Sequence, residues 1–74
     1  MAKYEAKSDV TGAIWKITTA VGDTVAEGDT IMIVESMKME IPVIAEEGGR
    51  IGEFRVKEGD PVNEGDVVVL IETS

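Results

Sequence analysis

The second half of the chain repeats the first at a spacing of 37 residues. Residues 21–29, VGDTVAEGD, align with residues 58–66, EGDPVNEGD, and six of these nine positions are identical. The match extends outward through three further pairs, Gly12/Gly49, Ile14/Ile51 and Glu35/Glu72. Arrays of stacked repeats need at least three units to bury a continuous core. Two copies therefore predict a closed domain of two similar halves that face each other.

Each half has the pattern of a strand, a Gly-Asp turn and a second strand. The predicted strands cover residues 12–20 and 30–35 in the first half, and residues 49–57 and 67–72 in the second. Valine, isoleucine and threonine dominate these runs, and β-branched side chains favour a pleated surface over a helix. We therefore predict an all-β domain, a small flattened barrel or sandwich.

Apolar residues in the two halves also predict the core and its irregularities. The spacing of Ile14 and Ile17, and of Ile51 and Phe54, breaks the two-residue alternation at equivalent places, which predicts a bulge in each strand. The predicted core consists of Ile14, Ile17, Val25, Ile31, Ile33, Ile51, Phe54, Val62, Val68 and Leu70. Trp15, next to Ile14, should point to the opposite face, either half-exposed or, as we favour, covered by residues 3–7.

Composition excludes several classes of function. The 74 residues suffice for one domain, residues 1–74, without room for a deep substrate cleft. The absence of cysteine and histidine removes thiol and imidazole catalysis and the usual zinc or iron–sulfur ligands. A net charge of −8 disfavours nucleic acid and anionic membranes as partners. With no apolar run of membrane-spanning length and no signal peptide, the expectation is a cytoplasmic protein that is not an enzyme.

The segment between the two halves breaks the local rules for a turn. Residues 35–42, ESMKMEIP, lead from one strand directly into the next without the Gly, Asn or Asp that a two-residue hairpin prefers. If the chain reverses here, Met37 and Lys38 occupy the turn, and local rules tend to fail where function overrides them. Since Lys38 maps onto a chain end under the 37-residue repeat, the hairpin and the termini should lie at opposite ends of the domain.

Lys38 is also isolated by charge. It is the one basic residue between Lys16 and Arg50, an interval that contains seven carboxylates. A catalytic lysine needs desolvation or a neighbouring cation, whereas Glu35 and Glu40 favour its charged form. Lys38 is therefore predicted to be the substrate of another enzyme, an attachment point that its flexible stem would extend.

Exposed methionines on both sides of a turn lysine suggest a surface that another protein reads, because methionine suits adaptable binding surfaces. The sequence Glu35-Ser36-Met37-Lys38-Met39 resembles the attachment signature of biotinyl domains, and the resemblance covers essentially the whole chain. It implies a flattened β-barrel of two four-stranded antiparallel sheets with quasi-twofold symmetry. The position of Ser36 is more often alanine in that family. We expect this change of one hydroxyl to lie at an exposed site and to leave the family assignment unaltered.

By this resemblance, Lys38 would carry biotin on its ε-amino group, attached by a biotin protein ligase. The attached biotin would then relay carboxyl groups from a biotin carboxylase to a carboxyltransferase. Glu35, Ser36, Met37, Met39 and Glu40 form the implied recognition motif. Residues 17–22 leave no room for the inserted thumb of some bacterial carriers, so the chain is similar to the thumbless form. Because no Ala/Pro-rich linker precedes Lys3, it resembles the freestanding type most.

Three other readings stay open on the sequence. A lipoyl carrier has the same fold, with its lysine at the same turn between the two halves, but usually has an acidic residue before that lysine and a small one after it. Dual attachment of biotin and lipoate is also possible. An adaptor of the membrane-fusion type would interrupt the tip with a helical hairpin. Metal binding at the turn aspartates lacks the spacing of a known calcium loop, so solvated carboxylates, and no metal site, are expected.

Overall fold

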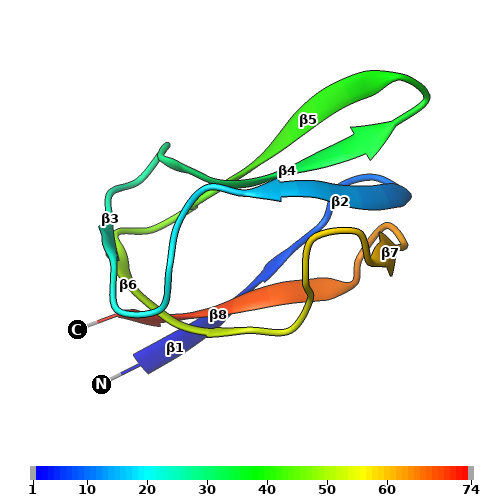
Figure 1. Cartoon of the computed structure of the whole chain (residues 1–74). Helices are drawn as coiled ribbons and strands as arrows, with labels where there is room; N and C mark the ends of the chain where they lie inside the picture. Colours follow the sequence, from blue (N-terminus) through cyan, green and yellow to red (C-terminus); the bar gives the residue numbers. More distant parts are fainter. Residues whose placement is uncertain (1, 74) are drawn as a thin grey trace.

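The computed structural model describes residues 2–73, which form two four-stranded antiparallel sheets packed face to face (Figure 1). The eight strands are β1 (Ala2–Lys7), β2 (Gly12–Ile17), β3 (Thr24–Val25), β4 (Thr30–Ser36), β5 (Met39–Ile44), β6 (Gly49–Phe54), β7 (Pro61–Val62) and β8 (Val67–Thr73). One sheet has the order β1-β8-β6-β3 and the other the order β5-β4-β2-β7. The predicted all-β fold of two four-stranded antiparallel sheets is confirmed.

The repeat in the sequence is a repeat in space. Adding 37 to the residue numbers of β1, β2, β3 and β4 gives the bounds of β5, β6, β7 and β8 in turn. Exchange of each strand for its equivalent in the other half converts the strand order of one sheet into that of the other. The two halves are therefore related by quasi-twofold symmetry, and each sheet combines strands from both.

The predicted bulges are present at equivalent positions in the two halves. The register between β2 and β4 shifts between Ile14 and Lys16, and that between β6 and β8 shifts between Ile51 and Glu53. The extra residues are thus Trp15 and Gly52, which bend the two strands in the same way.

A second pair of bulges makes part of the predicted core wrong. The β4–β5 register shifts between Thr30 and Met32, and β8 has the equivalent irregularity opposite β1. Neighbouring residues therefore face inward together at Ile31–Met32 and at Val68–Val69, and the alternation restarts one residue later. Ile33 and Leu70, predicted to be buried, are turned to the outer faces and are half-buried.

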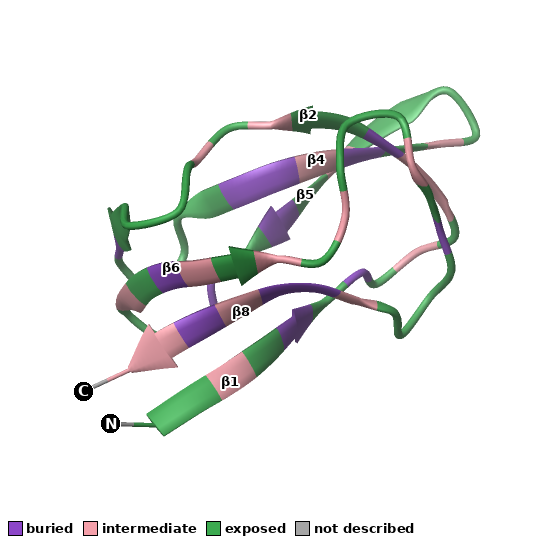
Figure 2. Cartoon of the chain, turned by 60° about the horizontal axis from the view of Figure 1, so that its bottom comes forward, coloured by how far each residue is buried: buried purple, intermediate pink, exposed green. Residues whose placement is uncertain are grey.

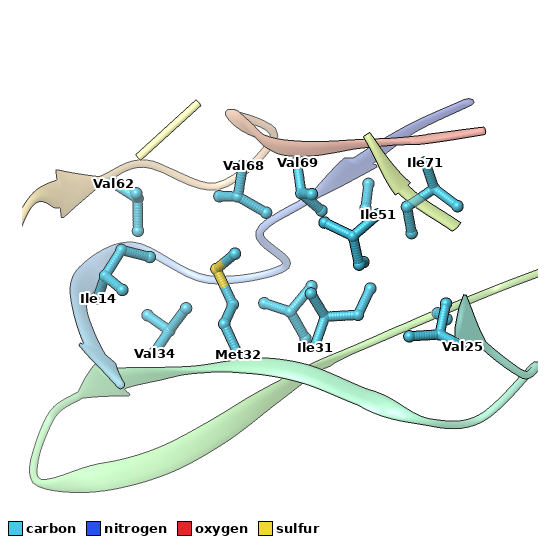
Figure 3. Close-up of a cluster of buried hydrophobic side chains, with 13 residues drawn as sticks. Ile14, Val25, Ile31, Met32, Val34, Ile51, Val62, Val68, Val69 and Ile71 are labelled. Atoms are coloured by element: carbon cyan, nitrogen blue, oxygen red, sulfur yellow. The ribbon is translucent and has the colours of Figure 1, made fainter. Parts of the chain in front are cut away.

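The observed core lies between the sheets (Figures 2 and 3). Its buried members are Ala6, Ile14, Val25, Ile31, Met32, Val34, Val43, Ala45, Ile51, Val62, Val68, Val69 and Ile71. Ile17 and Phe54, both predicted to be buried, are half-buried and pack against its edge. The preferred interpretation of Trp15 is wrong, because its side chain is 47% exposed. The strand formed by residues 2–7 joins the other sheet and leaves this residue uncovered.

Candidate functional site

The link between the two halves is a two-residue hairpin turn. β4 and β5 pair in register from Val34 opposite Ile41 up to Ser36 opposite Met39, which leaves Met37 and Lys38 as the turn. The chain therefore reverses where the sequence predicted. In Figure 1 this hairpin extends at one end of the molecule and the two termini lie at the other, as the quasi-twofold symmetry requires.

Both turn residues adopt a left-handed backbone conformation. The φ angles are 51° at Met37 and 65° at Lys38, and positive φ at both central residues is the signature of a type I′ hairpin. For a residue with a Cβ atom this conformation costs about 1–2 kcal/mol. Asn-Gly would fill the same turn at a lower cost, so the residues found here reduce the stability of the hairpin. Strained positions of this kind gather at functional sites.

The side chains of the turn are open to solvent. Met37 is 89% exposed and Met39 is 58% exposed, and Lys38 between them is exposed as well. Within residues 2–73, the one ion pair joins Arg55 Nη1 and Glu53 Oε2 at 3.6 Å. The ammonium group of Lys38 is therefore not held by a carboxylate of the described chain, and an enzyme can reach it without moving any part of the fold.

Ser36 anchors the base of the hairpin. Its hydroxyl donates a hydrogen bond to the backbone oxygen of Thr11 at 2.8 Å, and the hydroxyl oxygen of Thr11 accepts one from the backbone N–H of Glu64 at 3.1 Å. The expectation that this site is exposed is wrong, because Ser36 is half-buried and its hydroxyl fastens the hairpin to the loop before β2. The sequence gives no signal for this contact.

Gly12 permits the close approach of this loop to the hairpin. A Cβ atom at this position would lie 2.2 Å from the backbone oxygen of Glu35, which is far inside van der Waals contact. The repeat places Gly49 at the equivalent point in the other half, where a Cβ would lie 2.4 Å from the backbone oxygen of Glu72. The repetition of this glycine in the sequence was the available signal for the close contact.

Carboxylates flank the hairpin on its next rung. Glu35 and Glu40 are directly opposite each other on β4 and β5, and both side chains are exposed. Like charges in such a cross-strand pair are destabilising. The end of the hairpin therefore presents the ammonium group of Lys38 and, on the rung next to the turn's closing pair, the two carboxylates. Met37 and Met39 separate Lys38 from these carboxylates along the chain.

The turn aspartates are occupied with backbone hydrogen bonds. In each of the four Gly-Asp turns, the aspartate carboxylate accepts a hydrogen bond at 2.8–2.9 Å from the N–H three residues earlier. The glycines have φ between 90° and 94°, which suits the third position of a type II turn. Over residues 2–73, no group of three or more His, Cys, Asp and Glu side chains is arranged to hold a metal ion.

The chemistry available at the tip is that of an acceptor. Lys38 offers a primary amine, and the hydroxyl of Ser36, two residues earlier in the chain, donates its hydrogen bond to the Thr11 carbonyl. The described residues also include no helix long and apolar enough to cross a membrane. A protein that offers an exposed amine at the end of a two-stranded hairpin can receive a group from another enzyme and present it at a distance.

Comparison with known proteins agrees with this geometry. A family model described as "Biotin-requiring enzyme" matches residues 5–71. The biotin/lipoyl attachment protein of Bacillus subtilis (strain 168) is 45% identical over 47 residues, which is 64% of this chain and 64% of that protein. The biotin carboxyl carrier protein of Streptococcus mutans is 42% identical over 45 residues, covering 61% of this chain and 35% of that protein. Both matches thus span less than two thirds of the relative's own length.

The fold has a close counterpart among solved structures. In the crystal structure of the Kluyveromyces lactis urea carboxylase, a segment that amounts to 6% of that chain superposes on 97% of this one, with a TM-score of 0.92 and 39% sequence identity. The similarity includes both sheets and the hairpin, since it covers almost all of the residues described here.

Proposed function

The chain belongs to the biotin/lipoyl attachment domain family, and on this premise we propose that residues 1–74 are one biotin carboxyl carrier domain with Lys38 as its attachment residue. The observation that carries the proposal is the turn itself. Two residues that are unfavourable in a type I′ turn occupy its centre, and one of them is an exposed amine. A requirement for lysine between two methionines explains why these residues occupy the turn, whereas turn stability alone would favour Asn-Gly.

The residues present fit a covalently attached biotin. Lys38 is exposed, and no carboxylate of the described residues pairs with it. Its aliphatic stem adds four carbons of reach beyond the tip. An amide between its Nζ atom and the carboxyl group of biotin removes one positive charge, so the formal net charge moves from −8 to −9. Biotin supplies the group that takes up a carboxyl at one enzyme and releases it at another.

Reach and recognition are the contributions of the protein. The hairpin holds Lys38 away from the body of the domain, and the hydrogen bond from Ser36 to Thr11 fixes the direction of its base. Met37 and Met39 offer apolar surface to a partner, while Glu35 and Glu40 offer negative charge. Together these five residues, Glu35, Ser36, Met37, Met39 and Glu40, form the proposed recognition motif for a biotin protein ligase.

The proposed partners follow from the same role. A biotin protein ligase attaches the group, a biotin carboxylase loads it using ATP and bicarbonate, and a carboxyltransferase unloads it. The solved relative, urea carboxylase, is an enzyme in whose chain a domain of this fold is embedded. Because loading uses ATP, the cytoplasm is the proposed compartment.

Replacement of Lys38 by arginine tests the attachment residue. Arginine keeps the positive charge but is not acylated by the ligase, so the Lys38→Arg variant, co-expressed with a biotin protein ligase, should fold and show no signal on a streptavidin blot. Lys16→Arg is the matched control and should be labelled like the unsubstituted protein. Residual label on the Lys38→Arg variant would refute the assignment.

Lipoate is the second candidate group, favoured by one observation. The Bacillus subtilis relative is named a biotin/lipoyl attachment protein. Intact mass measured after incubation with a biotin ligase or with a lipoate ligase separates the alternatives, because the two groups add different masses. We expect complete modification with biotin; modification by lipoate alone would replace the proposal with a lipoyl carrier.

A further inference from the structure

The methionines of the described chain divide sharply by exposure. Met32 is fully buried in the core, whereas Met39 is 58% exposed and Met37 is 89% exposed. Figure 3 shows Met32 pointing between the sheets, among the valine and isoleucine side chains. The two exposed thioethers are the residues on either side of Lys38. We infer that Met37 and Met39 form an oxidation site that controls whether a ligase accepts Lys38, an inference that rests on the proposed carrier function.

Within residues 2–73, exposure directs mild oxidants to these two methionine side chains. The chain contains no cysteine, so no thiol competes for a peroxide, and susceptibility among the thioethers follows their accessibility. Met32 cannot be reached without unfolding the domain. Met37 and Met39 lie outside the core, so their oxidation should leave the fold intact.

The oxidation step needs only a peroxide. A lone pair on the methionine sulfur attacks one oxygen of hydrogen peroxide, the O–O bond breaks, and the departing hydroxide takes the proton from the transferred oxygen. The products are methionine sulfoxide and one molecule of water. Sulfur loses two electrons and the peroxide gains them. Methionine sulfoxide reductases reverse the step with two thiols, which become a disulfide as water is released.

Oxidation at these positions changes the surface that a ligase must contact. An enzyme that acylates the Nζ atom of Lys38 must surround the tip, and the neighbouring side chains are those of Met37 and Met39. The sulfoxide group turns a flexible apolar side chain into a polar one. Because removal of one small apolar contact from an enzyme pocket costs about tenfold or more in rate, two sulfoxides should reduce kcat/KM for biotin transfer by at least about tenfold.

The test combines a site map with a rate measurement. The unmodified domain is treated with dilute hydrogen peroxide and its peptides are analysed by mass spectrometry, with sulfoxide expected at Met37 and Met39 before Met32. The kcat/KM for ligase-catalysed biotin incorporation is measured before treatment, after it, and after incubation with methionine sulfoxide reductases. We expect the loss given above and recovery on reduction.

Two variants separate the tip from the core. The double variant Met37→Leu/Met39→Leu, whatever its starting rate, should show no further change on peroxide treatment, whereas Met32→Leu should lose activity like the unsubstituted domain. Equal rates before and after oxidation of the unsubstituted domain would overturn the inference, as would an equal loss in the double variant. Failure of the untreated domain to accept biotin would instead overturn the carrier function and, with it, the control of Lys38.

Discussion

Substitution of Lys38 by glycine should stabilise the domain, although it removes the proposed attachment residue. The lysine has a φ of 65°, and relief of this left-handed conformation is worth about 1–2 kcal/mol. Glycine also enlarges the conformational freedom of the unfolded chain, which offsets about 0.5–1 kcal/mol. At the midpoints of these two ranges, the net gain in free energy of unfolding should be about 0.75 kcal/mol. At about 4–8 °C per kcal/mol for a domain of this size, Tm should rise by about 3–6 °C.

Lys3→Gly is the matched control for this substitution. Lys3 is exposed on the edge strand β1, has no positive φ, and its replacement removes the same positive charge. This variant should lose about 0.5–1 kcal/mol, because it bears the cost of glycine without any relief of strain. Thermal unfolding followed by circular dichroism should therefore separate the two variants by about 4–16 °C. Equal destabilisation of both would refute the claim that the tip is strained.

Two contacts at the base of the hairpin give further expectations. Gly12→Ala should destabilise the domain by about 1–3 kcal/mol, because the new Cβ would lie 2.2 Å from the backbone oxygen of Glu35. Gly48→Ala is the control, since its Cβ would lie 3.5 Å from the nearest neighbouring atom. In urea titrations this control should change the free energy of unfolding by less than about 0.5 kcal/mol. Ser36→Ala should lower the free energy of unfolding by about 0.5–1.5 kcal/mol in the same urea titrations, since it removes the hydrogen bond to Thr11. An unchanged midpoint of the urea titration would show that this bond does not support the hairpin.

The sequence predicted the long strands of both halves and the place of the hairpin turn that joins them, because both depend on local chemistry. Gly-Asp turns fix where the chain reverses, and β-branched runs between them form strands. The hairpin turn was predicted because its residues break a local rule: Met37 and Lys38 are not among the residue types that a two-residue turn prefers. The structure shows the expected consequence, a left-handed backbone at both positions.

The errors arose where the structure depends on contacts between distant segments. The bulges at Ile31 and Val68 shift the inward face by one residue, and two consecutive apolar residues in each strand disguise that shift. Ile33 was therefore assigned to the core in error. The covering of Trp15 depended on which sheet the N-terminal strand joins, and the bond from Ser36 depended on where the loop before β2 passes. Neither is encoded in local patterning.

The central claim is that the position of one lysine, rather than any catalytic group, defines what this domain does. It is tested most directly by incubation of the purified domain with a biotin protein ligase, biotin and ATP, followed by intact-mass measurement and peptide sequencing of all five lysines. The predicted result is a single addition of biotin less one water, located on Lys38. Addition at Lys3, Lys7, Lys16 or Lys57, or no addition at all, would contradict the account.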